Sequence, residues 1–421
     1  MKKRLQPIVG FLRKNFSILL ISALKAFGAL INVAITYLVV HHSTATDAGI
    51  FLFALSAIFI CSYVARLGSD NYIVSKLSGQ WTQDTRKDAA TLYTGSLAFS
   101  IACTAIMGAG AWLAIPGVSA GNAVMTSACV LFFSIGQINS RVLQAQGKLK
   151  SSAFLMGVAA PLFFVAIYGV ACLAGKADFD GTQLIAIYAV ACLASSAIGF
   201  RKDLISRISW RDATRASHDV LPFFQTGFIA ICILWGGQFW AGAILPMAQL
   251  SDIAASQRLS MPINLLLVAA SIALSPRLSQ HHSNGDLPAI RNLMFDAGWA
   301  MVIFGAPVFI ASILFLDPLA AAFHVENKWL IAIFCLAQLA NAATGNSIQL
   351  LNMTGNQSKA KRSVIFGGIV FLGGMGAASL APSQLSISLA IAAALVAQNI
   401  AAVYFSYKIF NIIPLYRKDR R

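Results

Sequence analysis

The chain has few charged residues, and acidic ones are especially scarce. Asp, Glu, Lys and Arg make up 11% of its 421 residues, and 31 basic residues stand against 15 acidic ones. Soluble domains carry about 25% charged residues, so this composition excludes an ordinary soluble domain. The mean hydropathy of +0.73 agrees. We therefore predict an all-α protein that crosses a membrane many times.

Motifs for metal, redox or nucleotide chemistry are also missing. The seven cysteines lie in apolar stretches and form no CxxC pair, so they are predicted to be small buried hydrophobes. Gly175-Lys176 lacks the other residues of a phosphate-binding loop, which argues against ATP hydrolysis. The pairs His41-His42 and His281-His282 are predicted to lie on opposite sides of the membrane. We expect no cofactor and no metal site.

Twelve apolar stretches are long enough to cross a bilayer as helices. They lack the ten-residue alternation that is typical of membrane β-barrels. We place them near residues 16–40, 48–69, 90–114, 121–145, 151–175, 182–200, 219–244, 251–275, 291–317, 328–352, 361–381 and 384–409. The expected fold is a bundle of about twelve transmembrane helices.

The basic residues are distributed unequally between the two sides of the membrane. All but five of the 31 fall in termini and loops of one side; Lys176 and Lys328 lie on the other side, and Lys25, Arg66 and Arg258 lie within spans. Because cytoplasmic loops carry the excess of Lys and Arg, both termini are predicted to be cytoplasmic, in a bacterial inner membrane. Such scattered charges suit anionic membrane lipids, so nucleic acid is not an expected partner.

The chain divides into two halves with the same plan. A cytoplasmic linker, residues 201–218, separates an N-terminal lobe of six spans, residues 1–200, from a C-terminal lobe of six spans with a short basic tail, residues 219–421. Short matches recur in order about half the chain apart, which indicates an internal duplication with the substrate bound between the lobes. The matches are Lys76–Gln80 with Arg277–Gln280, Thr46-Asp47 with Ser251-Asp252, and Leu143 and Gly147 with Leu351 and Gly355.

Lys25 lies midway along the first apolar stretch. Ser22, Asn32 and Thr36 lie on the same helical face. A charge at the bilayer centre costs roughly 2.5–3.5 kcal/mol, so it usually marks a transport pathway or a partner. We predict that this polar stripe is one wall of a wet cavity. The alternative is a structural lysine that snorkels or pairs with Asp296.

Several segments resemble a known transporter family. They are similar to polysaccharide-export (Wzx-like) flippases of the multidrug/oligosaccharidyl-lipid/polysaccharide (MOP) superfamily. The segments are Asp47–Ser56, Leu67–Val74, Ser251, Arg258-Leu259, Ser275–Leu278 and Leu351–Gly355. The resemblance implies two six-helix lobes around a central V-shaped cavity, a MATE-like arrangement.

The resemblance also implies a function. Members of this family carry lipid-linked oligosaccharides to the outer leaflet for lipopolysaccharide or exopolysaccharide synthesis. The implied partners are a polyprenyl-diphosphate-linked oligosaccharide and polysaccharide polymerase or export machinery. One alternative is a MATE-like exporter of drugs or organic cations. Another is an enzyme, a polymerase or ligase of lipid-linked glycans, but outer connections as short as Ala381–Gln384 leave little room for its catalytic groups.

An anionic diphosphate needs cations along its path through the membrane. Lys25 in the first span and Arg258 in the eighth are the deepest cations and lie in opposite halves. We expect them to face each other across the cavity and bind the diphosphate, Arg258 through a bidentate fork. The resemblance implies the same two sites. The alternative for Arg258 is a structural pair with Asp252.

Amide side chains are expected to bind the sugar hydroxyls, since each amide both donates and accepts hydrogen bonds. The alternative is hydrogen bonding between helices. The expected polar lining of the cavity comprises Asn32, Gln137, Gln338, Asn341, Gln349 and Asn352.

Few carboxylates are placed where they could couple transport to a proton or sodium gradient. Asp70 and Asp296 are the candidates, because burial of a carboxyl group favours its protonation near physiological pH. Asp252 is expected to cap the eighth span, as Asp47 opens the second.

Overall fold

The structure, a computed structural model, describes residues 2–69, 72–74, 83–114, 120–175, 178–205 and 210–416. These residues are almost entirely helical, as the composition predicts. The N-terminal lobe (N-lobe) contains α1 (Lys2–His41), α2 (Ala45–Arg66), α4 (Gln83–Ala114), α5 (Ala120–Ala145), α6 (Leu149–Gly157), α7 (Ala159–Leu173) and α8 (Gly181–Ile198). The C-terminal lobe (C-lobe) contains α9 (Trp210–Ile244), α10 (Met247–Ser283), α11 (Leu287–Leu314), α12 (Leu316–Ala322), α13 (Trp329–Thr344), α14 (Asn346–Met353), α15 (Gln357–Leu380) and α16 (Gln384–Phe410).

The predicted linker at 201–218 is partly helical. A short 3₁₀ turn, η1, covers Lys202–Leu204, and α9 already begins at Trp210. The connection between the two lobes is therefore shorter than the hydrophilic stretch that marks it. Hydrophilic residues at the start of α9 extend a transmembrane helix beyond its apolar part, as they also do in α4.

The apolar spans found among the described residues agree with the predicted fold. Ten helices among the described residues are long and apolar enough to cross a membrane, or eleven if α6 and α7, which meet at a bend of 50°, form one span. The prediction was twelve; the remaining stretch, 251–275, lies in α10, where the side chains of residues 264–266 and 268–273 lie outside the described part of the structure. Residues 251–258 of α10 are all buried, so this part of the helix contacts protein rather than lipid and can be polar.

The bend between α6 and α7 is caused by a proline. Pro161 has no N–H to donate to the carbonyl of Gly157, so the helical ladder is interrupted there. Helix α1 packs against this break through Gly28, where an added Cβ would lie 2.4 Å from the Gly157 carbonyl oxygen. Gly28 thus serves close packing of α1 on the N-lobe.

The two lobes end equivalent helices with the same turn. Gly147 after α5 and Gly355 after α14 have φ values of 78° and 72°. At each turn a backbone N–H reaches back to a leucine carbonyl, from Lys148 to Leu143 and from Asn356 to Leu351, both at 2.9 Å. This is the Schellman termination, which places a glycine in the left-handed conformation. The matched turns support the internal duplication.

The matched aspartates also hold equivalent positions. The Asp47 carboxylate of α2 accepts a hydrogen bond from the Gly181 N–H at the start of α8, at 3.0 Å. Asp252 of α10 accepts one from the Gln384 side chain at the start of α16, at 2.8 Å. Asp252 lies in the second turn of α10, so the expectation that it caps this helix was wrong. The third match, Lys76–Gln80, lies outside the described residues.

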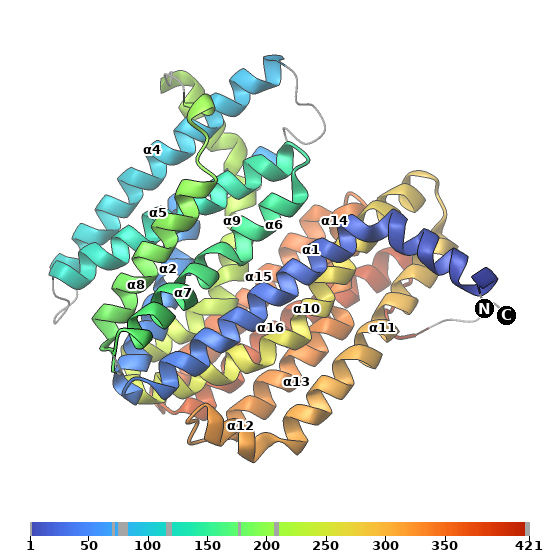
Figure 1. The fold of residues 1–421 in the computed structure, drawn as a ribbon. Coiled ribbons are helices and arrows are strands. Elements are labelled where there is room, and N and C mark those ends of the chain that lie inside the picture. The colour runs from blue at the N-terminus through green and yellow to red at the C-terminus, as the bar shows by residue number, and fades with distance from the viewer. Residues whose placement is uncertain are drawn as a thin grey trace.

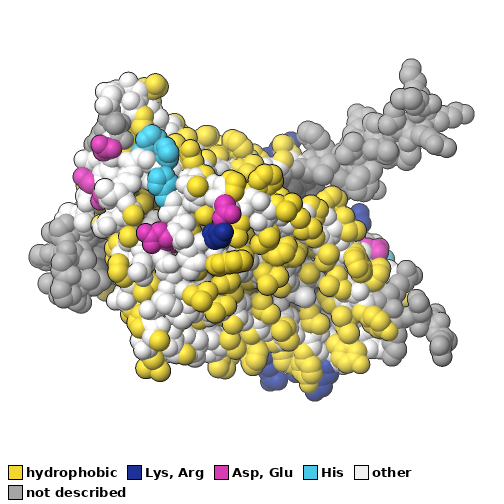
Figure 2. Space-filling view, turned by 90° about the horizontal axis from the view of Figure 1, so that it is seen from below, with side chains coloured by type: hydrophobic (Ala, Val, Ile, Leu, Met, Phe, Trp, Pro, Cys, Tyr) yellow, Lys and Arg dark blue, Asp and Glu magenta, His cyan; other side chains and the backbone are white. Residues whose placement is uncertain are grey.

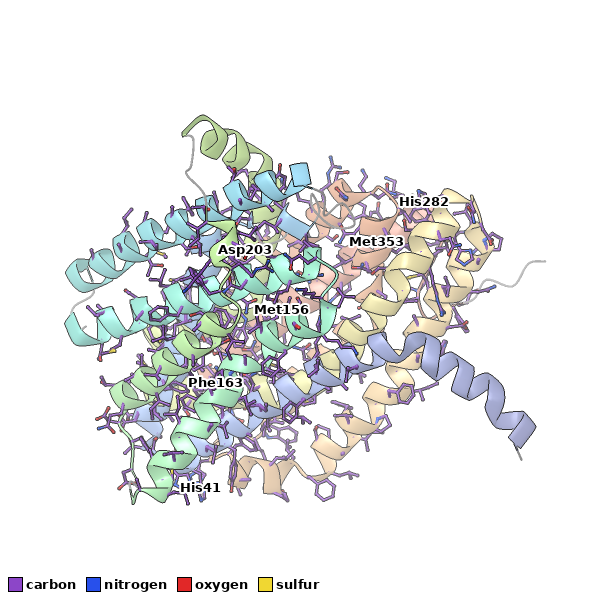
Figure 3. All side chains as sticks on the ribbon, turned by 45° about the horizontal axis from the view of Figure 1, so that its top comes forward. His41, Met156, Phe163, Asp203, His282 and Met353 are labelled. Atoms are coloured by element: carbon purple, nitrogen blue, oxygen red, sulfur yellow. The ribbon has the colours of Figure 1, made fainter. Side chains whose placement is uncertain are left out.

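The bundle has two distinct ends (Figure 1). We call the end that holds Met353 and His282 the terminal end, because the chain also begins there, and the end that holds His41 the far end; Figure 3 labels these three residues. His41 and His282 thus lie at opposite ends of the bundle. Seen from below, the molecule shows few Lys and Arg side chains and a patch of histidine (Figure 2).

Candidate functional site: a cavity between the lobes

The lobes are in contact at the far end. Gly49 of α2 fits against the start of α10, where an added Cβ would lie 1.9 Å from the Met247 carbonyl oxygen. The ring centroids of Tyr37 and Phe323 are 5.6 Å apart, and those of His41 and His324 are also 5.6 Å apart. These contacts join α1 and α2 to the C-lobe, and together they close the far end.

Helices α2 and α9 hold the lobes together along one side. Phe53 stacks on Phe239 with centroids 5.3 Å apart. The Ser56 hydroxyl donates to the Gln238 side chain at 2.5 Å, and both side chains are buried. Tyr63 stacks on Phe224, nearer the terminal end. Helices α2 and α9 thus join the lobes from the level of Phe53 to the level of Tyr63.

A cavity of about 490 Å³ lies between Lys25 and the C-lobe, and we call it the inter-lobe cavity. Lys25 is its lining residue from the N-lobe, while the other walls belong to α9, α10, α13, α14 and α16 and the Gly345 break. Three predicted amides line it. The polar lining residues are Lys25, Ser275, Gln338, Asn341, Gln349, Gln398 and Asn399.

Three amides of the inter-lobe cavity form a chain of hydrogen bonds, and a fourth bonds a serine. Asn399 donates to the Asn341 side-chain oxygen at 2.8 Å, and Asn341 donates to the Gln338 oxygen at 3.2 Å. Gln349 donates to the Ser275 hydroxyl at 2.5 Å. The buried side-chain oxygens of Gln398 and Asn399 have no hydrogen-bond partner among the described residues. These acceptors match hydroxyl donors such as those of a sugar.

The charge of the inter-lobe cavity is positive. Lys25 is half-buried, and no ion pair of the described residues includes it. Arg141 of α5 lies near enough to repel its charge. None of the described residues that line the cavity is acidic. A low-dielectric site with an uncompensated cation attracts an anion more strongly than water-exposed charges do.

Arg258 does not share this cavity. Its side chain is 3% exposed, donates to the Thr36 hydroxyl at 3.3 Å, and lies over the Trp235 ring at 5.8 Å. Lys25 and Thr36 are about three helical turns apart on α1, which is roughly 16 Å. The structure thus separates the two cations that we expected to face each other, because the lobes close together between them.

Other predicted residues lie elsewhere. Asn32 and Gln137 line a smaller N-lobe cavity of about 130 Å³, and Gln137 also bonds the Met156 carbonyl at 3.0 Å. Asn352 is half-buried one turn beyond Gln349 and does not line the inter-lobe cavity. The polar stripe of α1 therefore meets a cavity at Lys25 but close packing at Thr36.

The two proposed ion-coupling carboxylates are not in the inter-lobe cavity. Asp296 is exposed on α11 and does not line the inter-lobe cavity. The alternative prediction, a pair of Asp296 with Lys25, is therefore wrong. Asp70 lies outside the described residues. The alternative pair of Arg258 with Asp252 is also absent from the described ion pairs, since Asp252 bonds Gln384 and the Glu326 N–H instead.

Solved structures with similar folds are transporters. An inward-facing multidrug-resistance transporter of the MATE family, MOP superfamily, has a TM-score of 0.72 at 13% identity and covers 91% of this chain and 94% of its own. The lipid II flippase MurJ, in an inward closed conformation, has a TM-score of 0.70 at 11% identity, with 93% and 87% covered. The chain has the MOP transporter fold. Neither a family model nor a curated protein matches the sequence.

Members with the MOP fold have been solved in more than one state. An outward-facing MATE transporter has a TM-score of 0.64 to this chain, below the 0.72 of the inward-facing one. The MATE multidrug transporter DinF-BH, solved in a complex, has a TM-score of 0.65 at 14% identity, with 96% of this chain and 97% of that chain covered. The structural similarity establishes the fold of the chain. At these low identities it does not identify the substrate.

Proposed function

We propose that the chain is a flippase that carries a polyprenyl-diphosphate-linked oligosaccharide from the cytoplasmic to the outer leaflet. The terminal end would face the cytoplasm of a bacterium, as the excess of basic residues there indicates. The observation that carries the proposal is the described lining of the inter-lobe cavity, which has one cation, Lys25, among amides and no carboxylate. Such a site is complementary to an anionic diphosphate that bears sugars.

The two cations would act one after the other. In the state described, Lys25 faces the inter-lobe cavity, with the positive charge of Arg141 nearby, and would hold the diphosphate. Rocking of the lobes would part α1 from α10 at the far end and release Arg258 from Thr36. The guanidinium would then offer its donors to the diphosphate on the outer side. Alternating access of this kind places one site between two repeats and opens it to each side in turn.

An exporter of drugs or organic cations is the alternative within the same fold. The positive charge at Lys25 would repel a cationic substrate, and no described lining residue of the inter-lobe cavity is acidic. The structural neighbours are transporters rather than enzymes, which adds to the argument against a glycan polymerase or ligase. The anion flippase therefore has the stronger support.

The test is translocation of a lipid-diphosphate-linked oligosaccharide in reconstituted vesicles. Lys25→Ala and Arg258→Ala should each lower the rate about tenfold or more, because a charge-assisted contact to phosphate is lost. Lys25→Arg should retain more activity than Lys25→Ala. Lys202→Ala, an exposed cation outside the inter-lobe cavity, is the control. Wild-type rates in both alanine variants, at normal protein levels, would remove the anion site.

A further inference from the structure

A second cavity carries positive charge on the outside of the N-lobe. It has a volume of about 660 Å³ and lies where α5, α6 and the end of α8 meet α1. We call it the basic groove. Three cations line it, and its apolar lining includes aromatic rings. The lining residues include Lys148, Lys150, Arg201, Leu24, Phe154 and Phe200.

The cations of the basic groove are held by different means. Arg201 is fixed by Asp203, at 2.8 Å, and by Gln146, at 2.7 Å, and the Asp203 carboxylate raises the pKa of this guanidinium. Lys148 and Lys150 are exposed, and the glycine turn at Gly147 positions the first of them. Asp203 is the carboxylate partner of Arg201 in these contacts. The groove therefore gathers three cations from its described residues beside an apolar surface.

The local backbone adds to this field. Helix α6 begins at Leu149, between the two lysines, and no side chain of the described residues caps its N-terminus. The positive end of the helix dipole therefore points toward the same region. Cations beside apolar walls suit a ligand that has both a phosphate group and a hydrocarbon chain. Free inorganic phosphate would contact the cations but not the apolar walls.

The position of the basic groove relates it to the inter-lobe cavity. Leu24 lines the groove and its neighbour Lys25 lines the cavity, so the two spaces lie on either side of α1. Arg141, whose charge acts on Lys25, is on α5, the helix that ends at the groove. The lysines of the groove, Arg141 and Lys25 form a succession of cations from the surface to the cavity.

We propose that the basic groove binds the diphosphate of the lipid-linked substrate before the headgroup enters the inter-lobe cavity. This inference rests on the proposed function. The lysines would hold the diphosphate and the aromatic rings would contact the first part of the prenyl chain. An anionic phospholipid has related chemistry, so the experiment must separate the two sources of phosphate.

The experiment is photo-crosslinking in nanodiscs of phosphatidylcholine, with farnesyl diphosphate as the probe. A photoreactive residue replaces Ser151 in the groove, and in a second protein it replaces Gln398 in the inter-lobe cavity. Lys148→Gln with Lys150→Gln should weaken probe binding at the groove about tenfold. Lys359→Gln with Lys361→Gln removes the same charge from the start of α15 and should leave binding unchanged.

Competition with a phospholipid separates the two sources of phosphate. Phosphatidylglycerol should compete poorly with farnesyl diphosphate; equal competition would assign the groove to bulk lipid and overturn the inference.

Transport measurements separate the groove from the inter-lobe cavity. Lys25→Gln should keep crosslinking at position 151 while losing transport. If the groove double variant transports at the wild-type rate, the loading role is wrong and the flippase proposal stands. If the groove binds the probe but the wild-type protein moves no lipid-linked glycan, the proposed function fails instead.

Discussion

The Nη1 atom of Arg258 donates to the Thr36 hydroxyl oxygen at 3.3 Å and so joins α10 to α1 across the two lobes. The second terminal nitrogen of the guanidinium, Nη2, is buried without a hydrogen-bond partner among the described residues. A buried cation with an incomplete set of acceptors is costly. The closed far end therefore holds Arg258 in a state from which an anionic ligand could release it.

Thr36→Val tests this connection. Valine keeps the shape of threonine and removes the acceptor, so a charged donor is left unpaired at a cost of about 1–3 kcal/mol. We expect the closed far end to become less populated. Spin labels on α1 and α10 at the far end, read by pulsed distance measurements, would detect the shift. Thr344→Val, whose hydroxyl bonds only its own helix at Ala340, is the control; equal distributions in both variants would contradict the role.

Gly49→Ala should also open the far end. The added methyl group would lie 1.9 Å from the Met247 carbonyl oxygen, which is backbone and cannot turn aside. The lobes would have to separate there while each lobe stays folded. Gly169→Ala is the matched control, since a Cβ at that helical position meets nothing within 4 Å. Reaction of an engineered cysteine at His324 with an external thiol reagent should rise in Gly49→Ala alone. No change in labelling would show that α2 and α10 separate by other means.

The sequence predicted the helical bundle well, because its helices depend on local signals. Apolar length sets the helices, and glycine at Gly147 and Gly355 marks the same turn in both halves. Three of four amides predicted around Gly345 line the inter-lobe cavity, since helical spacing reliably places residues on one face.

The predicted meeting of Lys25 with Arg258 failed because it depends on the angle between the lobes, which no local pattern records. Lys25 and Thr36 lie on one continuous face of α1. The lobes are apart at the level of Lys25 and in contact at the level of Thr36. Gln398 and Asn399 were not predicted, although amides in the middle of an apolar span are the same signal that marked Gln338.

Gln398→Glu should reduce transport by charge alone. The side chain lines the inter-lobe cavity with Lys25, and a carboxylate of the same shape would neutralise the cation and repel a diphosphate. We expect at least a tenfold loss in translocation rate, whereas Gln398→Leu should lose less. Gln225→Glu, on the exposed side of α9 beside Lys361, is the control. Faster export of a cationic dye by Gln398→Glu would further support the anion preference of the native cavity, and a wild-type flipping rate would argue against it.

Asp252 offers a test of its structural role against a role in proton coupling. Asp252 is 6% exposed, and its carboxylate accepts from the Gln384 side chain and the Glu326 N–H in two part-buried hydrogen bonds. Asp252→Ala removes both bonds and should lower stability by about 1–3 kcal/mol. Asp47→Ala, its counterpart in the N-lobe, removes a less buried contact to Gly181 and should cost less. Thermal unfolding in detergent measures which of the two variants loses more stability.

Asp252→Asn keeps an acceptor oxygen but cannot ionise, so we expect wild-type transport with the wild-type dependence on pH. A flattened pH profile in that variant alone would instead make Asp252 the coupling carboxylate, in place of a tether between α10 and α16.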